Sequence, residues 1–92
     1  MSDLTFDISN NVIDFVTKLE AKQVRQVWNK VTALKKDPRP NNSEHLSGYP
    51  GLFRIPIGEF RCVYEPTSES VKIILIERRN DDKVYQALKR KS

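Results

Sequence analysis

The sequence contains little that would cross-link a small protein or anchor it in a membrane. Cys62 is the single cysteine among 92 residues, so no internal disulfide bond can form and no oxidising compartment is indicated. No run of about 18 apolar residues occurs, and we therefore expect no membrane-spanning helix. The N-terminal segment carries acidic residues and no basic stretch, unlike a secretory signal peptide. These absences favour one cytoplasmic domain over residues 1–92.

Histidine is as scarce as cysteine. His45 is the only histidine of the sequence, and we expect it in a surface loop. One histidine and one cysteine do not form a zinc site, and the sequence offers no carboxylate cluster for another metal. The sequence thus predicts neither a metal nor a small-molecule cofactor.

The charge balance is moderately basic. Sixteen lysines and arginines stand against twelve aspartates and glutamates, which gives a formal net charge of +4. An excess of this size suits a phosphate-rich partner, but it also occurs in domains that have none. The tail Lys89–Ser92 is mostly basic, and two interpretations of it stay open: a solvated tail or a contact to RNA.

The N-terminal half predicts a strand and two helices. Leu4–Ile8 alternates apolar with polar residues, as a strand does, and Ser9 or Asn10 can cap a helix that follows. A break near Glu20–Lys22 would give two packed helices, whereas one long bent helix is the alternative. Asp37–Pro40 must end the helical part, because each proline removes a backbone donor. The second helix has a clear apolar stripe: Val24, Val27, Trp28, Val31 and Leu34.

The C-terminal half predicts a three-stranded meander and a last helix. Leu52–Ile57 alternates, Gly58-Glu59 makes a two-residue turn, and Phe60–Tyr64 continues the hairpin. Val71–Ile76 is almost continuously apolar, which is typical of a central strand covered on both faces. Asn80 can cap a last helix. The fold class is therefore α+β in the order β-α-α-β-β-β(-α), with a helical hairpin packed on a small, mainly antiparallel sheet.

Strand alternation assigns the side chains of the hairpin to two faces. The helices need an apolar sheet face to cover, and one set of alternating residues supplies it: Phe53, Ile55, Ile57, Phe60, Cys62 and Tyr64. Arg54 and Arg61 are then left together on the opposite face.

Further cations and a phenol are expected near these two arginines. The third strand ends in Arg78 and Arg79, and the last helix carries Lys83 and Tyr85 within a turn or two. Guanidinium groups can hold a phosphate and stabilise a pentacoordinate phosphorane, while a tyrosine made more acidic by cations could deprotonate a ribose 2′-hydroxyl. That chemistry cleaves RNA without a metal, although arginine is a poor proton donor for the leaving oxygen. The candidates for additional RNA contacts are Arg78, Lys83, Lys89 and Arg90.

Four segments together resemble a known family. Leu46–Ile55, Gly58–Tyr64, Arg78-Arg79 and Val84-Tyr85 are similar to the RelE/ParE toxin superfamily of bacterial and archaeal toxin–antitoxin systems. The resemblance covers nearly the whole chain. It implies the α+β fold described above and a cognate antitoxin protein as a partner.

The RelE branch of this superfamily cleaves messenger RNA in the ribosomal decoding site without a metal. The resemblance therefore implies the ribosome and messenger RNA as partners of an endoribonuclease. By position, Arg54 and Arg61 match residues that contact the scissile phosphate. Arg79 matches an arginine that stabilises the transition state or the leaving group, and Tyr85 matches the proposed base. Pro56 is a departure, because RelE has a second lysine at this place.

Other interpretations stay open at this point. A ParE-like chain would inhibit DNA gyrase without cleaving RNA, and an inactive member would serve only to bind an antitoxin or DNA. Arg54 and Arg61 can also be ordinary strand residues paired with Glu59 or Glu77. Tyr85 can simply pack against its neighbours.

Overall fold

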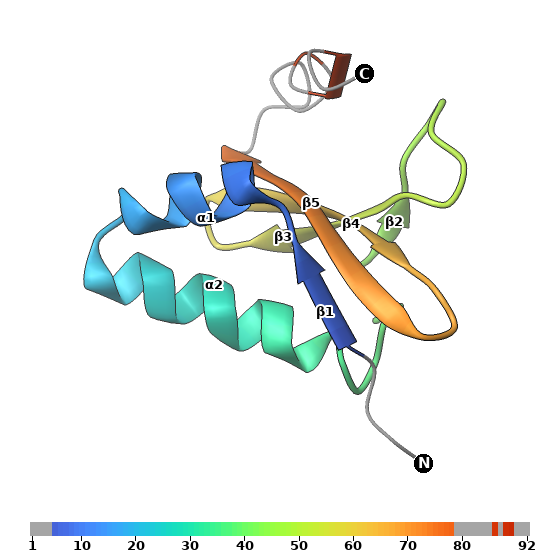
Figure 1. The fold of residues 1–92 in the computed structure, drawn as a ribbon, viewed down its shortest axis with the longest axis horizontal. Helices are drawn as coiled ribbons and strands as arrows, with labels where there is room; N and C mark the ends of the chain where they lie inside the picture. Colours follow the sequence, from blue (N-terminus) through green and yellow to red (C-terminus); the bar gives the residue numbers. More distant parts are fainter. Residues whose placement is uncertain (1–4, 79–85, 87, 90–92) are drawn as a thin grey trace.

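The computed structural model describes residues 5–78, 86 and 88–89 (Figure 1). This part of the chain is of the α+β class, as the sequence predicts, and none of its helices is long and apolar enough to cross a membrane. Its elements in chain order are β1 Thr5–Ile8, α1 Asn10–Thr17, α2 Ala21–Ala33, β2 Glu44–His45, β3 Phe53–Ile57, β4 Phe60–Pro66 and β5 Ser70–Arg78. The start of the expected last helix at Asn80 lies outside the described residues.

The strands form one mixed sheet in the order β1-β5-β4-β3-β2. β1 runs parallel to β5, and every other neighbouring pair is antiparallel. β5 is therefore an interior strand, as its apolar run predicts. The sequence interpretation left Glu44–His45 in a loop, whereas these residues form the short edge strand β2 beside Phe53 and Arg54. A strand of two exposed residues has no apolar alternation that could reveal it.

The helical region consists of two helices rather than one bent helix. α1 ends at Thr17, and Glu20 is the N-cap of α2. The Glu20 side chain accepts from the backbone of Gln23, and the Glu20 N–H donates to Gln23 Oε1 at 3.1 Å. This reciprocal capping satisfies two backbone donors at the start of α2, so a new helix begins here.

Both helices lie on one face of the sheet (Figure 1). Tyr64 is fully buried at this interface, and its hydroxyl donates to the Pro38 carbonyl at 2.7 Å, which ties the end of the helical hairpin to β4. The buried residues of this main core are Val12, Val16, Val27, Val31, Leu34, Ile55, Ile57, Phe60, Cys62, Tyr64, Val71, Ile73 and Ile76. The hairpin residues assigned to the helix-covered face from the sequence thus pack where expected.

A β-bulge interrupts the pairing of β4 with β5. Tyr64 pairs with Ile73 and Val63 pairs with Leu75, so Ile74 is an extra residue on β5. The Asn11 side chain at the start of α1 donates to the Ile74 carbonyl at 3.2 Å. Because one residue is inserted, the side-chain alternation of β5 is reversed beyond the bulge.

A second, smaller apolar cluster lies on the opposite side of the sheet, which we call the open face. Its buried residues are Leu46, Val63, Leu75 and Leu88, with Tyr49, Leu52 and Ile74 packed against them. The loop between β2 and β3 and the C-terminal Leu88 therefore cover part of the open face. The remainder of this face carries the candidate site.

Candidate functional site

Arg54 and Arg61 both belong to the open face, as strand alternation predicts. Arg54 pairs with Val63 of the open-face cluster, and Arg61 pairs with Pro56. The two arginines are thus diagonal neighbours on adjacent strands, within reach of one phosphate group for such long side chains. The Nε atoms of both side chains are buried. Burial of Nε restricts the rotation of each guanidinium group, so the pair is partly oriented before any ligand binds.

Arg54 contacts a carboxylate that the sequence interpretation did not name. Its Nη2 atom lies 3.5 Å from Glu44 Oε2 on the edge strand β2. The Arg54 side chain is 18% exposed and that of Glu44 is 64% exposed, so water screens this ion pair from one side. Glu44 holds Arg54 toward the β2 edge. This contact could not be predicted from the sequence, because it depends on the pairing of the short strand β2 with β3.

Arg61 has a carboxylate as its neighbour on β5. The register pairs Arg61 with Glu77, which places both side chains on the open face with their Cβ atoms about 5 Å apart. One carboxylate oxygen of Glu77 also accepts from the backbone N–H of Arg78 at 3.0 Å. The candidate site therefore combines two guanidinium groups with two carboxylates.

Arg78 does not join this group, and the expectation that it converges with the open-face arginines is wrong. Arg78 pairs with Phe60, whose ring belongs to the helix-covered core. Its guanidinium carbon lies 5.7 Å from the centre of the Phe60 ring, and its Nη1 atom lies 3.8 Å from Glu59 Oε1. The bulge at Ile74 explains the difference, since it reverses the alternation on which the expectation rested.

The other predicted site residues follow β5. Arg79, Lys83, Tyr85 and Arg90 lie outside the described residues. Lys89 is exposed and has helical backbone, and its neighbour Leu88 is buried in the open-face cluster. Leu88 thus packs on the face that carries Arg54 and Arg61.

The buried titratable groups of the helix-covered face are unsuited to proton transfer. Burial raises the pKa of the Cys62 thiol to about 12, so the thiol stays protonated and inert. Burial also raises the pKa of Tyr64, although a hydrogen bond with Ser43 opposes this shift. Within residues 5–78, 86 and 88–89, no three His, Cys, Asp or Glu side chains lie close enough to hold a metal ion.

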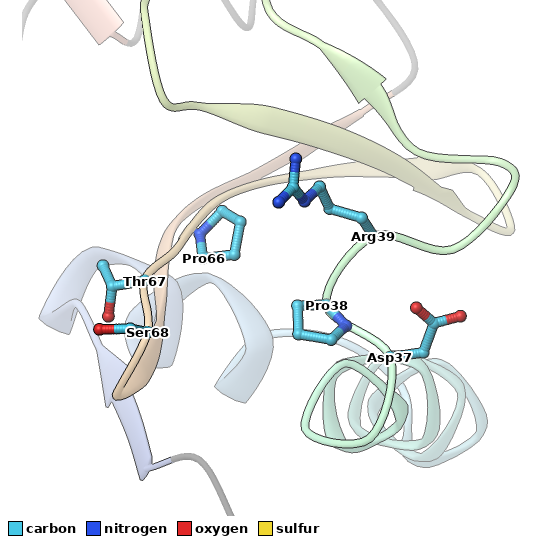
Figure 2. Close-up of a pocket in the computed structure, with 6 residues that line it drawn as sticks. All are labelled: Asp37, Pro38, Arg39, Pro66, Thr67 and Ser68. Carbon is cyan, nitrogen blue, oxygen red and sulfur yellow. The ribbon is translucent and has the colours of Figure 1, made fainter.

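A cleft of about 520 Å³ lies away from the open-face arginines (Figure 2). It opens between the segment after α2 and the turn between β4 and β5, and its lining residues are Asp37, Pro38, Arg39, Pro66, Thr67 and Ser68. The Arg39 guanidinium lies 5.6 Å from the centre of the Phe53 ring. Arg54 and Arg61 are not among the residues that line this cleft.

Solved structures share this architecture. A mutant of the E. coli toxin RelE in the free state matches with a TM-score of 0.76 and 23% identity, over 97% of this chain and 98% of that chain. The chain has the RelE-like toxin fold. RelE in the RelE–RelB complex of Pyrococcus horikoshii OT3 matches this RelE-like chain with a TM-score of 0.74 and 20% identity, over 84% of this chain and 96% of that chain.

The YoeB dimer of Staphylococcus aureus extends the comparison to a second kind of toxin. It matches with a TM-score of 0.72 and 17% identity, over 86% of this chain and all of that chain. No protein-family model and no curated protein sequence matches the sequence. The RelE-like fold is therefore established by structural similarity. The sequence identities are too low to carry over an activity, so the activity has to be argued from the site.

Proposed function

We propose that this RelE-like protein is the toxin of a type II toxin–antitoxin system and cleaves messenger RNA on the ribosome without a metal. The observation that carries the proposal is the placement of Arg54 and Arg61 as diagonal neighbours on the open face, each with a buried Nε atom. Two guanidinium groups held in this way can bind one phosphate through several charge-assisted hydrogen bonds. The RelE-like fold supports the same conclusion.

The reaction follows from the chemistry of RNA. A base takes the proton of a ribose 2′-hydroxyl, the 2′-oxygen forms a bond to the adjacent phosphorus, and the bond to the 5′-oxygen breaks. The 5′-oxygen takes a proton from water as it leaves, so the products are a 2′,3′-cyclic phosphate and a 5′-hydroxyl. Arg54 and Arg61 stabilise the charge that develops on the phosphorane. By their match to RelE, we assign Arg79 to the same charge and Tyr85 to the base.

Metal independence is part of this proposal. Arginine side chains supply the charge stabilisation that divalent ions supply in other nucleases, and they stay protonated throughout. Lys83, Lys89 and Arg90 are assigned to additional contacts with the RNA backbone. The partners in this proposal are the ribosome, messenger RNA and a cognate antitoxin in the cytoplasm.

The antitoxin is proposed from two observations. Several similar structures are toxin–antitoxin complexes, including RelBE of E. coli and RelBE2 of Mycobacterium tuberculosis. In addition, the open face carries the partly exposed apolar residues Tyr49, Leu52 and Ile74 beside exposed charges. Such a surface suits a segment that folds as it binds, because apolar contacts give affinity and charged ones give register.

Pro56 favours one alternative, an inactive module that binds its antitoxin but does not cleave. It lies directly opposite Arg61 in the hairpin register, where RelE has a basic residue by the sequence resemblance. This position lacks one cation and one backbone donor.

Primer extension on a translated messenger, with purified protein and ribosomes, tests the proposed function. New cuts within codons are the expected result, and they should persist when free catalytic metal is chelated while the ribosomes stay intact. An absence of cuts would support the inactive module. Inhibition of DNA gyrase with intact translation would support a ParE-like function.

A further inference from the structure

The exposed face of α2 and of the turn after it is uniformly basic. Between Ala21 and Lys36 the sequence contains lysines and arginines but no aspartate or glutamate. One of the cations, Lys35, points back to the Phe6 ring at 5.5 Å. The others are exposed, and we call them the α2 cations: Lys22, Arg25, Lys30 and Lys36.

The α2 cations are not neutralised by neighbouring acids. In residues 5–78, 86 and 88–89, none of the four takes part in an ion pair. Two flanking carboxylates are engaged elsewhere, because Glu20 caps α2 and Glu59 contacts Gln23 and Arg78. Asp37, which is exposed and follows Lys36, is a single acid beside the four cations. The charge of this face is therefore available to an external anion.

The α2 cations form an elongated surface rather than a pocket. With a rise of 1.5 Å per residue, the helical part of the row, from Lys22 to Lys30, is about 12 Å long, and Lys36 extends it into the turn after α2. Gln26 and Asn29 lie between the cations, and with Lys22 and Arg25 they line a shallow depression of about 300 Å³. Since α2 and the open face lie on opposite sides of the sheet, this surface is separate from the candidate site (Figure 1).

We propose that the exposed face of α2 binds the phosphate backbone of double-helical RNA. A row of cations neutralises successive phosphates, and amide side chains can hydrogen-bond ribose 2′-hydroxyl groups, which DNA lacks. Single-stranded RNA is usually held by stacking on exposed aromatic rings. The aromatic residue of α2, Trp28, instead packs against the main core. The α2 surface is therefore suited to a duplex, whose bases are not accessible for stacking.

This assignment deepens the proposed function, on which it rests. A toxin that cleaves a messenger on the ribosome must be held by structured RNA while its open face contacts a single strand. The α2 surface would supply the first contact and Arg54 with Arg61 the second.

The test measures binding, not cleavage, so its result is independent of whether the protein is a nuclease. The full-length protein is titrated against a labelled RNA duplex of about 16 base pairs at salt concentrations from about 50 to 200 mM. The same titration is done with a variant in which K22Q, R25Q, K30Q and K36Q are combined. Each phosphate contact contributes about 0.9 to the slope of log K against log salt, so the four substitutions should lower the slope by about 3 to 4.

Single substitutions give the matched control. Lys30→Gln should lower the slope by about 1, whereas Lys72→Gln should leave it unchanged. Lys72 is an exposed lysine whose Nζ atom lies 4.0 Å from a carboxylate oxygen of Glu65, away from α2. All these side chains are exposed, so thermal unfolding should show intact folds.

Two results would overturn the inference. If the fourfold variant keeps the parental slope, the α2 cations do not contact the duplex. If a DNA duplex of the same sequence binds as tightly as the RNA duplex, the surface does not distinguish RNA.

Discussion

Arg61 and Glu77 are cross-strand partners on the open face, with Arg61 on β4 and Glu77 on β5. A carboxylate beside a phosphate-binding arginine opposes the approach of an anion, since like charges repel. It also limits how strongly RNA binds before the reaction.

Removal of the Glu77 charge should therefore strengthen RNA binding. We expect Glu77→Gln to lower the KM for programmed ribosomes about fivefold, a change of about 1 kcal/mol for one partly solvated charge, with kcat unchanged. Steady-state cleavage kinetics measure both constants. A loss of kcat with an altered pH profile would instead show that the Glu77 carboxylate takes part in proton transfer. Glu44→Gln should act in the same direction, because Glu44 lies 3.5 Å from Arg54. Glu65→Gln is the matched control and should leave both constants unchanged, because the Glu65 carboxylate contacts Lys72.

The two open-face arginines should be needed for chemistry, and Arg78 should not. Arg54→Ala and Arg61→Ala should each reduce cleavage about 10²–10³-fold, because each removes a donor to the developing charge. Arg78→Ala removes the same group from the other face of the sheet and should retain most of the activity. Cleavage rates on programmed ribosomes decide the matter. Similar losses for all three variants would contradict the separation of faces described here.

Tyr85→Phe separates a catalytic role of this residue from a packing role, because it removes only the hydroxyl. If Tyr85 is the base, cleavage should fall by a factor on the order of 10²–10⁴. A single-turnover rate measurement is the suitable assay, since it excludes product release. Parental activity of this variant would mean that another group removes the proton.

Stability should fall in alkaline solution because of Cys62. Burial raises the pKa of this thiol from 9.0 to about 12, so the folded state binds the proton more tightly than the unfolded state. The stabilisation from the neutral thiol is complete below pH 9 and is lost as the pH rises toward 12, at up to about 1.4 kcal/mol per pH unit. Urea unfolding of the parent and of Cys62→Ala at several pH values measures this contribution of the Cys62 thiol to the free energy of unfolding. The difference in stability between them should shrink with rising pH, and a constant difference would refute the assignment.

Alternation in the hairpin was sufficient to predict the faces of the two catalytic candidates. Residues on β3 and β4 alternate without interruption from Phe53 to Ile57 and from Phe60 to Tyr64, so Arg54 and Arg61 could be placed opposite the core from the sequence. The break between α1 and α2 was one of two alternatives, and the capping by Glu20 and Gln23 shows which holds.

The bulge and the edge strand could not be predicted in the same way. Ile74 lies within an unbroken apolar run, where every residue suits either face and no polar side chain marks a change of phase. The predicted face of Arg78 was wrong for this reason. The strand β2 consists of only two residues, both exposed, which pair with Phe53 and Arg54 across a loop. Two exposed residues show no alternation of apolar and polar side chains from which a strand could be predicted.

The extra residue at Ile74 also decides which changes in chain length this protein can tolerate. Loss of one residue at the bulge would leave a regular ladder in which Glu77 and Arg78 keep their present faces. Loss of one residue between the bulge and the end of β5 would exchange them, and the open face would then present Arg78 opposite Arg61. Gain of one residue there would also reverse the faces, and it would place Ile76 opposite Arg61. Among relatives of this chain, we therefore expect insertions and deletions at the position of Ile74, and we expect selection against them between Leu75 and Arg78.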